Sequence, residues 1–268
     1  VGLQNSMSSD GITIDSTPPV LSYVYIGGKR HRDSPQIGLS SFVTANWKFK
    51  DFDSSIIRYT VSIHHVENTS QFVGPWVFPG NQTSGYLNLE QNHLTHKERY
   101  VLSVTALNGA RLSSTGISND FLVDGTAPIC TNIYDVTIDG SRTSFSGLTS
   151  KLAVHASCND IETGILKYEF AIKEIKSHEY IFPFHSVKIF LASLVVVDGF
   201  GKHHVKLQNG NHYQVGLRVT NNVNITSEYW TSGVTIDTTA PRFRRVISSY
   251  NVHRNAFQVV WELSDHES

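Results

Sequence analysis

The sequence has little cysteine, little charge of either sign and no long apolar run. Its 268 residues include two cysteines, and 17% of them are charged, with a formal net charge of −1. So small a net charge predicts no nucleic-acid partner and no membrane-binding surface. The longest apolar run, Ile189 to Val197, is interrupted by Ser193 and is too short to cross a bilayer. We expect contact with a membrane only through parts of the protein that this sequence does not contain.

Motifs that carry catalysis are also missing. The sequence has no Gly-x-Ser-x-Gly elbow, no phosphate-binding loop and no Gly-x-Gly-x-x-Gly turn. Its 13 histidines are scattered, without the spacing of a metal site on a helix. The tripeptide Arg-Gly-Asp, a known integrin contact, does not occur. We therefore expect a protein that is not an enzyme.

The sequence does contain a linker motif in three copies. Asp15-Ser-Thr-Pro-Pro19, Asp124-Gly-Thr-Ala-Pro128 and Asp237-Thr-Thr-Ala-Pro241 each follow a short β-prone run. Their spacing, from 15 to 124 and from 124 to 237, is a domain length rather than the period of a solenoid. The chain is therefore predicted to be a tandem array of domains.

Other positions repeat in the same register. Trp47 precedes Asp51, Asp53 and Tyr59 at the spacing with which Ala156 precedes Asp160, Glu162 and Tyr168, and Trp261 precedes Asp265 and Glu267. Tyr100 and Tyr213 begin matching alternating runs that end at Asn108 and Asn221. The predicted domains are the C-terminal strand of a preceding repeat at 1–15, whole repeats at 16–124 and 125–237, and the start of a further repeat at 238–268. Because both ends fall inside a repeat, we interpret the chain as a piece of a longer protein.

Each whole repeat alternates apolar and polar residues over about seven short segments separated by turn residues. In the first repeat these are 20–26, 42–47, 57–63, 76–78, 86–89, 100–108 and 116–123, and in the second they are 129–136, 152–157, 165–175, the apolar region 180–197, 213–221 and 228–236. Val43, Ala45 and Trp47 should share one buried face. The fold class predicted is all-β, as tandem seven-stranded β-sandwiches.

A family resemblance rests on particular residues. A tryptophan in the second strand (Trp47), a tyrosine in the third (Tyr59) and the pattern Leu207, Tyr213, Val215, Leu217, Val219, Asn221 resemble the fibronectin type III module, an immunoglobulin-like β-sandwich. The second repeat departs from the pattern with Ala156 in place of the tryptophan, so neighbours must fill that volume. The linkers resemble those between repeats of large extracellular animal proteins and of bacterial surface adhesins. The resemblance implies a module rather than a function.

Cys130 and Cys158 both lie in the second repeat. A disulfide between them would join its first strand to the end of its second, and two buried free thiols are the alternative. A disulfide agrees with an extracellular or cell-surface location. The first repeat lacks the pair, so the bond is not required by the fold.

Two features of the predicted surface could have a function, the N-glycosylation sequons and a run of basic residues. Sequons begin at Asn68, Asn81 and Asn224, in segments predicted to be loops or turns, and we expect N-glycosylation if the protein is secreted by a eukaryote. The basic run Lys29-Arg30-His31-Arg32 could bind sulfated glycans or an acidic partner, or could be a solvated loop.

The sharpest hypothesis concerns calcium at the linkers. In a type III sandwich the loop after the second strand lies beside the entering linker. Three acidic residues would then gather at each junction, and the candidate sets are Asp15, Asp51 and Asp53; Asp124, Asp160 and Glu162; and Asp237, Asp265 and Glu267. Calcium prefers such oxygen clusters, but the same acids could instead cap their own turns.

The function predicted is that of an extracellular structural or adhesive segment, stiffened by proline at each linker. Its partners would be other extracellular or cell-surface proteins, or copies of itself. One alternative is a receptor ectodomain that binds a ligand through loops at one end of a sandwich. Another is a carbohydrate-binding accessory module of a secreted hydrolase, with Trp76 and Trp230 as exposed platforms, since Trp47 and Trp261 are expected in cores.

Overall fold

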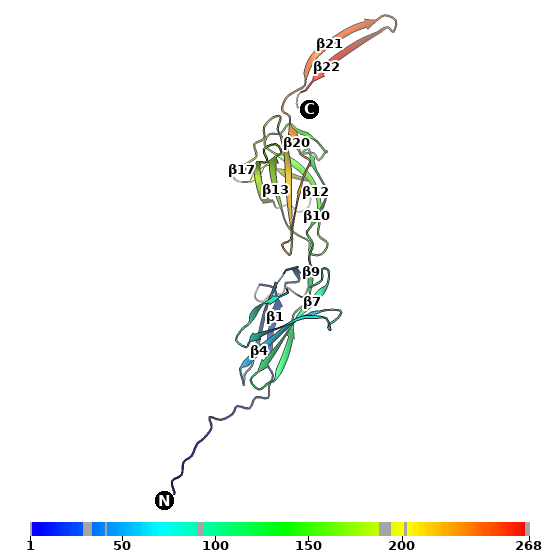
Figure 1. Cartoon of the computed structure of the whole chain (residues 1–268). Helices are drawn as coiled ribbons and strands as arrows, with labels where there is room; N and C mark the ends of the chain where they lie inside the picture. The colour runs from blue at the N-terminus through cyan, green and yellow to red at the C-terminus, as the bar shows by residue number, and fades with distance from the viewer. Residues whose placement is uncertain are drawn as a thin grey trace. The chain divides into compact units, whose positions relative to one another are not determined.

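The computed structural model describes residues 2–28, 34–40, 42–89, 94–187, 194–200 and 203–265. Within these ranges all regular structure is β-strand, and there is no helix that could cross a membrane. The chain divides into two compact units, residues 1–126 and 127–268. Residues 2–19 form no strand (Figure 1). The assignment of 1–15 to the last strand of a preceding repeat stays a prediction.

Unit 1 is a sandwich of two sheets (Figure 1). One sheet has the order β1-β3-β6, and the other has the order β2-β9-β7-β4-β5 with β8 added beside β7. The strands are β1 (Val20–Ile26), β2 (Gln36–Gly38), β3 (Phe42–Lys50), β4 (Ile56–His65), β5 (Phe72–Pro79), β6 (Ser84–Asn88), β7 (Arg99–Asn108), β8 (Ser113–Ile117) and β9 (Phe121–Asp124).

The core of unit 1 is built around Trp47. Along β3 the residues at 43, 45 and 47 are buried, as the alternation predicted, and Asn46 and Phe49 are buried as well. The Trp47 ring is fully buried, 5.7 Å from the Tyr59 ring and 5.0 Å from the Phe78 ring, and its Nε1 donates to the Gln82 carbonyl at 3.0 Å. The indole thus fills the space between the sheets and has its one polar group paired.

Unit 2 repeats this arrangement. One sheet has the order β10-β12-β15, the other has the order β11-β20-β18-β13-β14 with β19 beside β18, and β16 and β17 pair separately. The strands are β10 (Ile129–Val136), β11 (Phe145–Ser146), β12 (Leu152–Asn159), β13 (Ile165–Glu174), β14 (Tyr180–Val187), β15 (Leu194–Val197), β16 (Gly199–Phe200), β17 (His203–His204), β18 (His212–Asn221), β19 (Thr226–Trp230) and β20 (Val234–Ile236).

The core of unit 2 lacks a tryptophan, as expected from Ala156. Ala156 is only partly buried against the core, and the large fully buried rings there are those of Phe170, Phe182 and Tyr213. The two phenylalanines come from β13 and β14, so the second sheet supplies the aromatic volume that β3 supplies in unit 1.

The prediction of seven strands per repeat needs correction in detail. In unit 1 the segment 116–123 was predicted to be one strand, but the structure has two strands there, β8 and β9, separated by residues 118–120. Strand β2 was not predicted. Three-residue β2 pairs in parallel with β9 at the sheet edge. A segment so short shows no alternation for a sequence pattern to detect.

The last two strands, β21 (Arg242–Asn251) and β22 (Ala256–Ser264), form a separate hairpin (Figure 1). Val246 pairs with Trp261 as Val24 of β1 pairs with Trp47, and each pairing has an irregularity close to the start of its first strand. The hairpin thus repeats the first strand pair of a sandwich. The expectation that Trp261 lies in a core is wrong for this chain, because the two-stranded hairpin leaves its side chain 60% exposed.

Candidate functional site at the linker turns

The three linker motifs form the same turn. In each, Oδ1 of the aspartate accepts hydrogen bonds from the backbone N–H and the hydroxyl of the threonine two residues later. The distances are 2.9 and 3.2 Å for Asp15 and Thr17, 2.9 and 3.0 Å for Asp124 and Thr126, and 3.0 and 3.0 Å for Asp237 and Thr239. Such a turn uses the carboxylate of the aspartate and the hydroxyl of the threonine, which accounts for the recurrence of Asp and Thr together.

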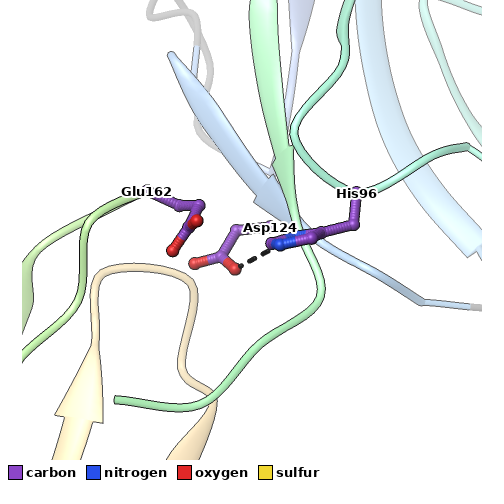
Figure 2. Close-up of side chains that lie close together, drawn as sticks. All are labelled: His96, Asp124 and Glu162. Atoms are coloured by element: carbon purple, nitrogen blue, oxygen red, sulfur yellow. Dashed lines mark ion pairs between the residues drawn. The ribbon is translucent and has the colours of Figure 1, made fainter. Parts of the chain in front are cut away.

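The backbone N–H of the residue after the aspartate is also hydrogen-bonded in two of the linkers. Its acceptor is a side chain in the loop before the tyrosine of β7 or β18. Gly125 N–H donates to His96 Nδ1 at 3.0 Å, and Thr238 N–H donates to Asn209 Oδ1 at 2.6 Å. His96 Nδ1 also lies 3.6 Å from Asp124 Oδ1 (Figure 2). His96 and Asn209 occupy the same position in their repeats. Each exit linker is therefore tied to a loop of the repeat that it leaves.

Those loops are fixed in turn by buried tyrosines. The Tyr100 hydroxyl accepts from Thr95 N–H at 2.9 Å, and the Tyr213 hydroxyl accepts from Gln208 N–H at 3.0 Å. Both tyrosines are 3% exposed or less. This is the tyrosine corner of immunoglobulin-like sandwiches. It connects the hydrophobic core to the linker through a few hydrogen bonds.

In unit 1 the entering linker meets the acids that the sequence analysis placed beside it. Asn108, buried at the end of β7, donates from Nδ2 to Asp15 Oδ2 at 2.8 Å and to Asp51 Oδ2 at 3.0 Å. The Thr17 hydroxyl donates to Asp53 Oδ2 at 2.8 Å. The structure therefore brings Asp15, Asp51 and Asp53 into one hydrogen-bonded group. Asn108 at its centre is a residue that the sequence analysis did not assign to the site.

Asp51 also caps its own turn. Its Oδ1 accepts from Ser54 N–H at 2.8 Å and from Asp53 N–H at 3.2 Å. The Ser54 N–H bond, followed by the Asn108 amide, lowers the pKa of Asp51 below its ordinary value. The carboxylate is thus held in its charged form by hydrogen-bond donors.

Asp160 has the matching role in unit 2. Its Oδ1 accepts from Thr163 N–H at 2.8 Å and from Gly164 N–H at 3.1 Å, and its Oδ2 accepts from Asn221 Nδ2 at 3.1 Å. The turn-capping alternative therefore holds for Asp51 and Asp160. Glu162 lies in the turn that follows, Asp265 follows β22, and Glu267 is outside the described residues. Calcium binding at the linkers stays a prediction.

The two cysteines of unit 2 are joined. Cys130 and Cys158 lie directly opposite each other on the antiparallel strands β10 and β12, with Cα atoms 4.0 Å apart, and their sulfur atoms are bonded. The disulfide thus links the first strand to the end of the second, as the sequence analysis expected, and no cysteine is free.

The three sequon asparagines are exposed. Asn68, Asn81 and Asn224 lie in the connections β4–β5, β5–β6 and β18–β19, where a glycan would not disturb a core. Their glycosylation stays a prediction. The basic run 29–32 is outside the described residues.

The tryptophans proposed as carbohydrate platforms have protein partners. Trp76 packs against the core of unit 1. The Trp230 ring covers Gly216, where a Cβ would lie 2.6 Å from the ring, and Lys173 Nζ lies 4.0 Å from the ring centroid. Both rings are also partly exposed, so the carbohydrate-binding alternative stays a prediction.

The fold and its repeated turns define two consecutive β-sandwich domains. No known protein family and no curated protein matches the chain. Solved structures that are similar to it include the domains FN1–FN3 of chicken CNTN1, at 11% identity and a TM-score of 0.39, covering 84% of this chain and 72% of that one.

Two further structures are similar over most of the chain. The fibronectin(III)-like modules of Clostridium thermocellum CbhA show 9% identity and a TM-score of 0.39, covering 80% of this chain and 94% of that one. A structure from a 1.5-MDa bacterial ice-binding adhesin shows 13% identity and a TM-score of 0.44, covering 90% of this chain and 72% of that one.

Proposed function

We propose that this chain is a non-enzymatic, extracellular structural or adhesive segment, in which β-sandwich repeats follow one another through stiff linkers. The observation that carries the proposal is the linker turn, which has the same hydrogen bonds in all three copies. A flexible spacer would need none of them. A turn held in each copy by side-chain hydrogen bonds and followed by proline instead restricts the backbone at the junction.

The linkers are also attached to folded structure. Asn108 ties Asp15 to unit 1, and His96 and Asn209 tie the linkers that leave units 1 and 2. Because these contacts come from β7 or from loops beside the tyrosine corner, loosening a linker would break hydrogen bonds close to a core. This coupling supports a role in transmitting position or force along an array.

The location outside the cell rests on the Cys130–Cys158 disulfide, since such bonds persist in oxidising compartments. Other surface proteins, or further copies of the same protein, are the partners that we propose for such a segment. Their binding surface would be supplied by loops or by sandwich faces.

Limited proteolysis tests the stiffness of the linkers. Brief treatment with a low concentration of a non-specific protease should cut within residues 2–14, which are exposed and form no strand. The linker at 124–128 should survive, because its backbone is held by Asp124 and His96. Cleavage at 124–128 as fast as within 2–14 would contradict the proposal.

A further inference from the structure

Unit 1 has a hollow on the outer face of the β1–β3–β6 sheet, opposite the buried face that holds Trp47. Its volume is about 300 Å³, near the lower end of the range of ligand sites. The residues that line it come from β3, β6 and the two adjoining turns, and they are Gly28, Thr44, Ala45, Asn46, Gln82, Ser84, Gly85 and Tyr86.

The lining that the described residues give this hollow is polar and uncharged. Among the described residues that line it, Asn46 and Gln82 contribute amides, Thr44 and Ser84 contribute hydroxyls, and none carries a charge. Amides and hydroxyls both donate and accept hydrogen bonds. A ligand with many hydroxyl groups can pair with such a lining, whereas a charged ligand would find no counter-charge among the described residues that form it.

The two amides are held in place before any ligand binds. Asn46 is 8% exposed and donates from Nδ2 to the Gly27 carbonyl at 2.8 Å. Gln82 donates from Nε2 to the Ser84 carbonyl at 2.7 Å. Each bond uses one N–H of its amide and fixes the direction of the rest of the group. Such fixed groups reduce the entropy that a ligand must lose in binding.

An aromatic ring stands at the edge of the hollow. Tyr86, which pairs with Thr44 across the strands, is 74% exposed. Its ring lies edge-on to that of Phe42, with centroids 6.0 Å apart, so it has a packing partner within the sheet face. An exposed ring beside hydroxyls and amides offers an apolar surface for C–H groups next to hydrogen-bonding groups. A sugar ring has both of these surfaces.

A source of sugar is predicted immediately beside the hollow. Asn81, the exposed first residue of the sequon Asn81-Gln82-Thr83, is followed directly by Gln82 of the lining. We propose that this hollow binds an uncharged saccharide, and that the first two sugars of a glycan on Asn81 are its nearest source. This inference does not depend on the proposed structural role.

Titration with N,N′-diacetylchitobiose, the disaccharide at the root of N-glycans, tests the site. The whole chain, made in bacteria without glycans, is labelled with ¹⁵N and observed by NMR. The side-chain amide signals of Asn46 and Gln82 should shift saturably. Tyr86→Ala should weaken binding about tenfold, equivalent to roughly 1.4 kcal/mol of lost contact. The matched control is Phe72→Ala, which removes a 52% exposed ring from the other sheet and should not change binding.

A second arm distinguishes the source of the saccharide. Protein from eukaryotic cells should fail to bind the disaccharide if its own glycan fills the hollow, and Asn81→Gln should restore binding. Binding that persists in the glycosylated protein would assign the hollow to a saccharide from another molecule. The proposal is overturned if the unglycosylated protein shows no saturable shift of the two amides, or if Tyr86→Ala binds as tightly as the unchanged protein.

Discussion

At the scale of residues, a few buried polar side chains fix the turns of each unit and affect its stability. Asn108 and Asn221 are both fully buried at the ends of matching strands, and each joins a turn to an acidic side chain. Asp135 differs from them. It is 2% exposed, its Oδ2 accepts from Gly233 N–H at 2.8 Å, and its Oδ1 has no hydrogen-bond partner within the described chain.

The first prediction concerns Asp135. Burial raises the pKa of Asp135 above the ordinary 3.8. The Thr231 hydroxyl, the Gly233 N–H and nearby His212 lower this pKa, but the effect of burial is larger. The folded state therefore keeps the proton to higher pH than the unfolded state, and stability falls as pH rises from about 3.8 through the raised pKa. Asp135→Asn should stabilise unit 2 at pH 7, by about 1 to 3 kcal/mol.

Thermal unfolding at pH 3.5 and pH 7 measures this effect. The variant should gain at pH 7 and gain little at pH 3.5, where the carboxyl of the unchanged protein is mostly protonated. Equal effects at both pH values would mean that the charge of Asp135 does not set the stability.

The second prediction concerns Asn108. Asn108→Ala removes the amide shared by Asp15 and Asp51, and also removes the acceptor of Leu112 N–H. We expect unit 1 to lose about 2 kcal/mol of stability and the Thr17 N–H to exchange faster with solvent. Asn221→Ala is the matched control, because it should destabilise unit 2 without changing exchange at Thr17. Unchanged protection of Thr17 in Asn108→Ala would disconnect this asparagine from the linker.

At the scale of elements, strands and their edges explain most of the fold. The edge strands β5 and β14 carry Pro75 and Pro183, which lack the N–H that another chain could pair with. The disulfide connects two neighbouring strands of unit 2, and unit 1 has no such bond. The two units therefore reach stability by partly different means.

The third prediction follows from that difference. Replacing both cysteines with serine opens a closure of 28 residues, which the chain-entropy account values at about 3.5 kcal/mol. In calorimetry the transition of unit 2 should move to lower temperature while that of unit 1 stays in place. A shift of both transitions would show that the units do not unfold independently.

The fourth prediction is the calcium hypothesis. If the acids around Asn108 bind the ion, millimolar calcium should raise the melting temperature of chelator-treated protein, and Asp51→Asn should abolish that rise. The hydrogen-bonding role of Asp51 is tested by the same variant without calcium. A melting temperature that calcium does not change would leave Asp51 and its partners as turn residues only.

Much of this fold could be predicted from the sequence, because strand alternation is a local signal. The starts of β1 and β10 and the buried face of β3 coincide with the predicted positions. The short strand β2 and the exposure of Trp261 could not be predicted from the sequence, because both depend on which other strands are present. In the candidate site the acids were predicted from their repetition. Asn108 and His96 were not predicted as site residues, although both occupy repeated positions. Their roles depend on contacts between loops that are distant in sequence.

At the scale of the whole molecule, the central proposal is that the linkers are stiff. Every contact that supports it lies within a unit, from Asp15 and Asn108 at one linker to Asp237 and Thr239 at another. The same turn in three copies predicts the same restriction at every junction of a longer array.

Distance measurement between spin labels tests this claim directly. Labels at Val77→Cys and Leu166→Cys place one probe on an exposed strand position of each unit, while the native cysteines stay in their disulfide. A control pair at Val77 and Ile117 lies within unit 1. If the linker is stiff, the distance distribution between the units should have a single peak about as narrow as that of the control. The distribution should broaden when Thr126→Gly removes the hydroxyl that bonds Asp124. A broad or multiple distribution in the unchanged linker would contradict this proposal.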